Sequence, residues 1–101
     1  MPGTLYVVAT PIGNLGDLSQ RARDTLANVA VIACEDTRVS GVLLKRFAIA
    51  TPPLPYHDHN AERVRPQLLA RLAAGESVAL ISDAGTRLIS DPGYKLVRAC
   101  V

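Results

Sequence analysis

Two loops in this 101-residue chain concentrate residue types that commonly bind ligands, and each loop follows a short run of strand-forming residues. The first loop, residues 10–17, reads Thr-Pro-Ile-Gly-Asn-Leu-Gly-Asp. Gly13 and Gly16 permit a close approach of the main chain to a ligand, and Asp17 adds a carboxylate. The glycine spacing matches neither the Walker phosphate loop nor the dinucleotide-binding fingerprint, so these two modes of phosphate binding are not expected. On these residues alone, a simple turn and a ligand site are equally good interpretations.

The second loop, residues 82–93, is longer than the roughly two to six residues that a plain connection between a strand and a helix needs. It contains two acids, three hydroxyl side chains and two glycines. This composition after a buried strand favours a ligand-binding loop that begins with Ser82 and Asp83. The end of the loop, Asp91-Pro92-Gly93, is also typical of a turn that begins a helix, so that part needs no ligand to explain it.

Two further segments carry acids and imidazoles. Residues 34–38 read Cys-Glu-Asp-Thr-Arg, and residues 56–60 read Tyr-His-Asp-His-Asn. On extended backbone His57 and His59 would point to the same side, but a metal site needs a third ligand that the sequence does not identify. The simpler interpretation is a pair of partly exposed histidines before a helix that Asn60 caps. No metal site is predicted.

The elements that must position these loops alternate between strand and helix. Unbroken apolar runs, beginning with residues 5–9, are typical of parallel strands that are buried on both faces. Helical spacing of apolar residues and capping residues such as Ser19 mark the helices. Strands are predicted at residues 5–9, 29–34 and 78–81, and helices at 19–28, from 36 or 37 to 46, at 60–74 and from 93 onwards. This order predicts an α/β fold, with a mostly parallel sheet, helices on both faces, and ligands beyond the carboxyl ends of the strands.

Three local features refine this expectation. Residues 50–56 contain three prolines, so they are predicted to form a loop or an edge strand. Pro66 lies inside a helical span, which predicts that the regular helix starts late or bends there. Gly75 is expected to end that helix.

Composition and charge indicate one ordinary folded domain. Hydrophobic residues make up 49% of the chain and charged residues 20%, which excludes a disordered or fibrous chain. The formal net charge of +2 neither predicts nor excludes nucleic-acid binding. Cys34 and Cys100 lack the paired spacing of a zinc or redox motif, so both are expected to be reduced core residues. With no signal peptide or membrane-spanning stretch in the sequence, a cytoplasmic location without a membrane partner is expected.

Four segments, taken together and in this order, carry a resemblance to a known family: residues 8–19, 34–38, 57–60 and 81–93. The chain resembles the ribosomal RNA 2'-O-ribose methyltransferases, a branch of the tetrapyrrole methylase superfamily. The match spans essentially the whole chain, and four motifs in this order and spacing are specific to the branch. The resemblance implies S-adenosylmethionine-dependent methyl transfer to the ribose 2'-hydroxyl of a cytidine in 16S ribosomal RNA, within the small ribosomal subunit.

The resemblance also implies an architecture. Residues 1–101 would be the N-terminal α/β domain of a two-domain enzyme that holds its cofactor in the cleft between the domains and usually forms a homodimer. The chain stops inside a helical pattern, so more protein is expected to follow, and the isolated domain is expected to be inactive and to bind the cofactor weakly. By position in the family motifs, the expected contacts with S-adenosylmethionine are Pro11, Gly13, Gly16, Ser82, Asp83, Ala84 and Gly85.

Methyl transfer to a hydroxyl requires in-line alignment of oxygen, carbon and sulfur, and a base can help to remove the hydroxyl proton. The available bases are Asp17, Glu35, Asp36, His57 and Asp83. Loop position and family motif favour Asp17 and Asp83, followed by Glu35, as the catalytic residues. Glu35 and Asp36 could equally orient Arg38 or cap a helix.

One position departs from the family pattern, because Arg87 stands where this branch usually has proline after Ala-Gly-Thr. Arginine leaves the main chain freer than proline does, and it could contact RNA phosphate or be an ordinary surface residue.

Two alternatives to an RNA methyltransferase stay open. A tetrapyrrole-type small-molecule methyltransferase would share the fold and cofactor but lack the 35–38 and 57–60 segments. A non-catalytic nucleotide- or anion-binding module is the other alternative.

Overall fold

The computed structural model describes residues 3–10, 18–83 and 91–100, which form alternating strands and helices. The strands are β1 (Leu5–Thr10), β2 (Val31–Cys34), β3 (Pro53–Pro55) and β4 (Val78–Asp83). The helices are α1 (Gln20–Asn28), α2 (Thr37–Arg46), α3 (Ala61–Ala73) and α4 (Asp91–Cys100). The strands form one sheet in the order β1-β4-β2-β3, and every neighbouring pair is parallel. The predicted α/β class is confirmed.

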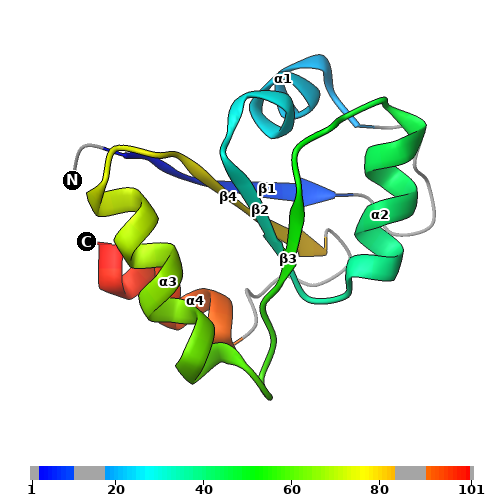
Figure 1. Cartoon of the computed structure of the whole chain (residues 1–101). Helices are drawn as coiled ribbons and strands as arrows, with labels where there is room; N and C mark the ends of the chain where they lie inside the picture. Colours follow the sequence, from blue (N-terminus) through cyan, green and yellow to red (C-terminus); the bar gives the residue numbers. More distant parts are fainter. Residues whose placement is uncertain (1–2, 11–17, 84–90, 101) are drawn as a thin grey trace.

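Helices cover both faces of the sheet (Figure 1). On one face, Leu26 of α1 and Leu44 of α2 share a core with Ile32 of β2. On the other face, α3 and α4 form a second core in which Leu68 joins Val31. Neighbouring residues of β2 therefore point into opposite cores, as the alternation of side chains along a strand requires. The chain crosses the sheet in one direction from β1 to β3 and returns from β3 to β4, so right-handed crossovers place α3 opposite α1 and α2.

The helix ends agree well with the sequence. Ser19 accepts a hydrogen bond from the main-chain N–H of Ala22 at the start of α1 (3.1 Å), and Asp36 caps α2 by the same kind of bond. Gly75, with φ of 95°, follows α3 and ends it as predicted. Within the described ranges, no helix is long and apolar enough to cross a membrane.

The first strand corrects one expectation, since it is not buried on both faces. β1 lies at one edge of the described sheet, and its Tyr6 and Val7 side chains are 42% and 47% exposed. An apolar run marks a strand but does not say whether the strand is central or lies at an edge. The short proline-rich β3 lies at the opposite edge, in agreement with the predicted edge strand.

Three element boundaries also differ from the prediction by two residues. β4 ends at Asp83 rather than at Ile81, so Ser82 and Asp83 belong to the strand and not to the loop that follows it. β2 begins at Val31, because Val29 closes α1 as its C-cap residue, although both side chains are buried. α4 begins at Asp91 rather than at Gly93. Proline is well tolerated in the first turn of a helix, where its missing N–H would have no helical partner, so Pro92 fits this earlier start.

Pro66 does not delay the helix that contains it. α3 is helical from Ala61 onwards, with Pro66 inside it, so the predicted late start is wrong. The missing N–H of proline costs one hydrogen bond close to the start of the helix. Burial of Val64 and Leu68 on either side stabilises the regular helix and outweighs that loss.

Candidate functional site

The carboxyl ends of the four parallel strands lie along one edge of the sheet, which we call the carboxyl edge. β1 and β4 end there at paired positions, because Thr10 is the partner of Asp83. β2 and β3 end there together, because Cys34 is the partner of Pro55. The two predicted ligand loops therefore leave the carboxyl edge from adjacent strands and from the same level.

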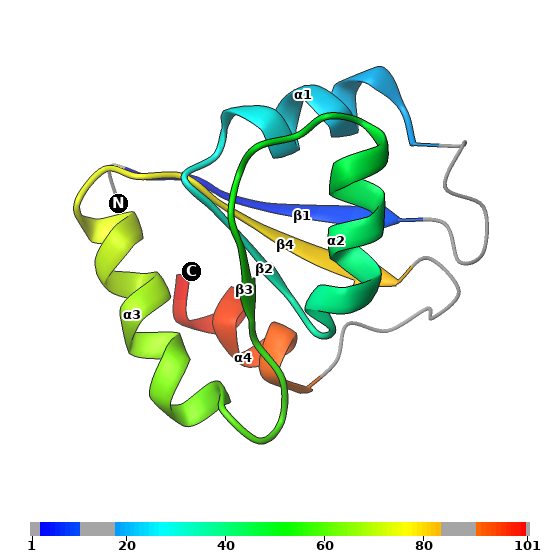
Figure 2. The same cartoon turned by 45° about the vertical axis from the view of Figure 1, so that its right-hand side comes forward.

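These two loops lead to opposite faces of the sheet. After β1 the chain runs to α1 on one face, and after β4 it runs to α4 on the other (Figure 2). In α/β proteins, ligands bind in the crevice outside the carboxyl edge where neighbouring strands send their connections to opposite faces. The junction of β1 and β4 is therefore the candidate site.

Part of the predicted site falls within the described residues. Ser82 and Asp83 are the last two residues of β4 and pair with Ala9 and Thr10 of β1. Glu35 follows β2, the other neighbour of β4, and is exposed at the carboxyl edge. The predicted positions that lie outside the described residues are Pro11, Gly13, Gly16, Asp17, Ala84, Gly85 and Arg87.

Asp36 serves the structure in two ways. Its Oδ1 accepts the main-chain N–H of Arg38 (2.9 Å), which caps α2. Its two oxygens also accept hydrogen bonds from the Arg38 guanidinium, from Nε at 3.2 Å and from a terminal nitrogen at 3.1 Å. The hydrogen bonds from Arg38 lower the pKa of Asp36, and a lower pKa makes a weaker base. Orienting Arg38 and capping the helix therefore explain Asp36 better than proton transfer does.

The histidine segment forms a turn rather than extended backbone. Asn60 closes this turn, because its Oδ1 accepts the N–H of His57 (2.9 Å) and its Nδ2 donates to the carbonyl of Pro55 (2.9 Å). Asn60 occupies the N-cap position of α3, as predicted, but its side chain makes no capping hydrogen bond, so the expected side-chain cap is absent. The amide cannot cap the helix while both of its polar atoms hold the turn.

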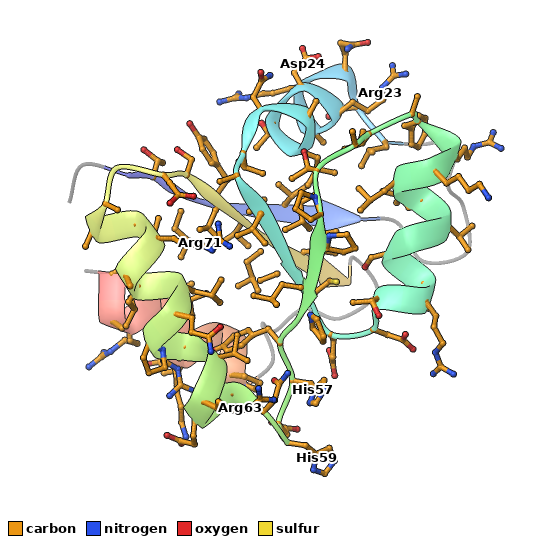
Figure 3. The ribbon with its side chains drawn as sticks, in the orientation of Figure 1. Arg23, Asp24, His57, His59, Arg63 and Arg71 are labelled. Carbon is orange, nitrogen blue, oxygen red and sulfur yellow. The ribbon has the colours of Figure 1, made fainter. Side chains whose placement is uncertain are left out.

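His57 and His59 lie beyond the end of β3 (Figure 3). Nδ1 of His57 accepts the N–H of His59 (3.2 Å), and the two ring centroids are 5.8 Å apart. Since β2 separates β3 from β4, the strand that leads into the histidine turn lies two strand spacings, roughly 10 Å, from β4. No group of three His, Cys, Asp or Glu residues within the described ranges is arranged to hold a metal ion. These observations favour a structural turn over a metal site.

Sequence reasoning missed a buried polar network between the end of β3 and helices α3 and α4. The side chain of Tyr56 is 2% exposed, donates its hydroxyl to the carbonyl of Pro92 (2.5 Å) and accepts a hydrogen bond from Nε of Arg65 (2.9 Å). Burial raises the pKa of Tyr56. Helical spacing was the available signal, because Arg65 lies beside the buried positions Val64 and Leu68 of α3.

Both cysteines are free thiols, as predicted. Cys34 is fully buried at the end of β2, and Cys100 is partly buried against the core beneath α3 and α4. Burial raises the pKa of each thiol. Because the thiolate is the reactive form, neither cysteine is a good nucleophile.

Comparison with known families agrees with this geometry. Residues 4–101 match the family described as Tetrapyrrole (Corrin/Porphyrin) Methylases. The match covers almost the whole chain, and the chain belongs to this family.

The chain is also similar to individual curated proteins. The chain is 59% identical over 98 residues to the Ribosomal RNA small subunit methyltransferase I of Synechocystis sp., covering 97% of the chain and 35% of that protein. It is 61% identical over 93 residues to the protein of the same name from Mesorhizobium japonicum, covering 92% and 32%. With the Haemophilus influenzae protein of that name it shares 55% identity over 100 residues, covering 99% and 35%. The chain thus spans about a third of the length of the curated relatives it matches.

Proposed function

We propose that this chain is the N-terminal domain of an S-adenosylmethionine-dependent methyltransferase that acts on the ribose 2'-hydroxyl of a cytidine in 16S ribosomal RNA. The observation that carries the proposal is the 55–61% identity, over nearly the whole chain, to proteins named Ribosomal RNA small subunit methyltransferase I. The junction of β1 and β4 supports it, because this is where an α/β sheet offers a ligand crevice.

S-adenosylmethionine, when bound, supplies a methyl group on a positively charged sulfur. The described ends of β1 and β4 fit such a ligand, because their main chains stop at paired positions and their connections diverge to opposite faces. The cofactor contacts that we propose at this junction are Pro11, Gly13, Gly16, Ser82, Asp83, Ala84 and Gly85.

Asp17, Asp83 and Glu35 are the proposed catalytic residues. Pairing with Thr10 holds the main chain of Asp83 at the centre of the carboxyl edge, and Glu35 is exposed next to β4. A carboxylate is a weak base toward a ribose hydroxyl, so alignment of the hydroxyl with the methyl group contributes more to the rate than proton removal does. Each of the three carboxylates can accept the hydroxyl proton, and substituting them one at a time would show which of them acts as the base.

The remaining parts of the proposal come from the family resemblance. They are a second α/β domain that completes the cofactor cleft, 16S ribosomal RNA within the small ribosomal subunit as substrate, a homodimer, and a cytoplasmic location. The names of the relatives favour RNA over a small-molecule substrate. Membership of a methylase family favours catalysis over a non-catalytic anion-binding module.

Calorimetric titration of S-adenosylmethionine and S-adenosylhomocysteine into this chain and into the full-length protein tests the proposal. We expect binding to the full-length protein only, followed by transfer of labelled methyl groups to unmodified small ribosomal subunits. Asp83→Asn should reduce that transfer, while Asp58→Asn, which alters an exposed acid in the histidine turn, should not. Absence of binding to either protein would refute a methyltransferase.

A further inference from the structure

Tyr56 joins three elements through one buried hydroxyl group. The residue directly follows β3, and its hydroxyl donates to the carbonyl of Pro92 in the first turn of α4. The same oxygen accepts a hydrogen bond from Nε of Arg65 on α3. The Arg65 side chain is itself only 15% exposed, and its guanidinium lies 3.7 Å from a carboxylate oxygen of Glu62. The hydroxyl therefore links the end of β3, the middle of α3 and the start of α4.

The chemistry of the partners fixes the direction of both hydrogen bonds. An arginine Nε can only donate and a main-chain carbonyl can only accept, so the Tyr56 hydroxyl must donate to Pro92. A phenol is protonated near neutral pH and can make this bond, and burial raises the pKa of Tyr56 further. The Tyr56 hydroxyl is then satisfied both as a donor and as an acceptor.

This link lies at one end of the connection between β4 and α4. At the other end, pairing with Thr10 holds the main chain of Asp83. Residues 84–90 run between these two fixed points, and the first of them, Ala84 and Gly85, are among the proposed cofactor contacts. The position of α4 relative to β4 thus sets the two ends that this connection must join.

We propose that Tyr56 and Arg65 are positioning residues for cofactor binding, because they hold the start of α4 in place relative to the end of β4. The inference rests on the proposed function and extends it to residues that do not touch the cofactor. It predicts that loss of the Tyr56 hydroxyl weakens ligand binding more than it slows the chemical step.

Tyr56→Phe in the full-length protein tests the inference against two matched controls. Tyr94→Phe removes the hydroxyl of an exposed tyrosine on α4 itself. Thr51→Val removes another buried hydroxyl, which donates to the carbonyl of Leu26 (2.7 Å) and so belongs to the α1 side of the fold. The readouts are the Kd for S-adenosylhomocysteine, KM for S-adenosylmethionine, kcat and Tm.

We expect Tyr56→Phe to raise Kd and KM by about 5- to 20-fold, within the range that loss of one buried hydrogen bond allows, and to change kcat by less than about twofold. Thr51→Val should lower Tm to a similar extent without changing Kd, and Tyr94→Phe should change neither quantity. Arg65→Lys, which keeps the positive charge but has no Nε donor, should raise Kd in the same direction as Tyr56→Phe.

Equal Kd values for Tyr56→Phe and Thr51→Val would overturn the inference. A wild-type protein that binds neither ligand would overturn the proposed function instead, and amide hydrogen exchange in the first turn of α4 would then decide whether the link exists. Faster exchange there in Tyr56→Phe than in Thr51→Val would support the link, and equal exchange would refute it.

Discussion

Two helices end in the same hydrogen-bonded turn but carry different residues at the position that requires left-handed backbone. After α2, the N–H groups of Ala48 and of the next residue bond to the carbonyls of Lys45 (3.2 Å) and Leu44 (2.9 Å), and φ of Ala48 is 54°. After α3, Gly75 has φ of 95°, and the corresponding bonds measure 3.1 and 3.0 Å. Only glycine adopts this backbone without a penalty from Cβ. We therefore expect Ala48→Gly to stabilise the protein and Gly75→Ala to destabilise it.

The magnitude follows from two opposing terms. Left-handed backbone costs a residue with a Cβ about 1–2 kcal/mol. Glycine at the same site loses about 0.4–1 kcal/mol more conformational free energy on folding than alanine does. The difference predicts that Ala48→Gly raises the free energy of unfolding by about 0.5–1 kcal/mol. For Gly75→Ala, φ lies farther from the left-handed minimum near 57°, so we expect a loss of about 1 kcal/mol or more.

Urea unfolding of both variants measures these differences. An unchanged m-value would show that the substitutions do not alter the unfolded state. Ala70→Gly is the control, because Ala70 is exposed within α3, where glycine should cost about 0.5–1 kcal/mol. Opposite signs for Ala48→Gly and Ala70→Gly are the expected result. If Ala48→Gly destabilises the protein as much as Ala70→Gly does, the left-handed turn after α2 is wrong.

Three further predictions concern single contacts. Gly3→Ala should destabilise the fold by about 1–3 kcal/mol, because a Cβ there would lie 2.1 Å from a main-chain oxygen after α3; an unchanged urea midpoint would contradict this. Thr51→Val should cost about 1–3 kcal/mol in urea unfolding, because it leaves the buried carbonyl of Leu26 without the hydroxyl bond. The pKa of Asp36 is lowered, so its contribution to stability is present above its unfolded pKa and is lost as pH falls through the folded value. Arg38→Ala should raise the pKa of Asp36 toward its ordinary value, and an NMR titration that shows no change would rule out the ion pair as the cause.

Local signals predicted most of the fold. Ser19 and Asp36 cap α1 and α2 because a short polar side chain can satisfy a free N–H within its own turn, and Gly75 ends α3 for an equally local reason. The errors arose where distant partners decide the outcome. Asn60 resembles a cap in sequence, but the turn after β3 takes both of its side-chain atoms. Tyr56 gave no local sign that its partners lie on α3 and α4.

The candidate site depends on a strand order that no local pattern contains. β4 is the last described strand along the chain, yet it lies between β1 and β2. Had it been added beyond β3, the loops after β1 and β4 would stand three strand spacings apart, roughly 14 Å, at opposite edges of the sheet. The insertion requires the chain to reverse direction after β3, and a right-handed return must then pass over the free face. That face can bury a helix, because Val31 and Ala33 of β2 are apolar there, just as Ile32 is apolar on the opposite face. The apolar residues on both faces of β2 allow helices to pack on both faces of the sheet, although the similar run in β1 shows that such a run alone does not establish this. Helices on both faces are what allow a crevice to form between β1 and β4.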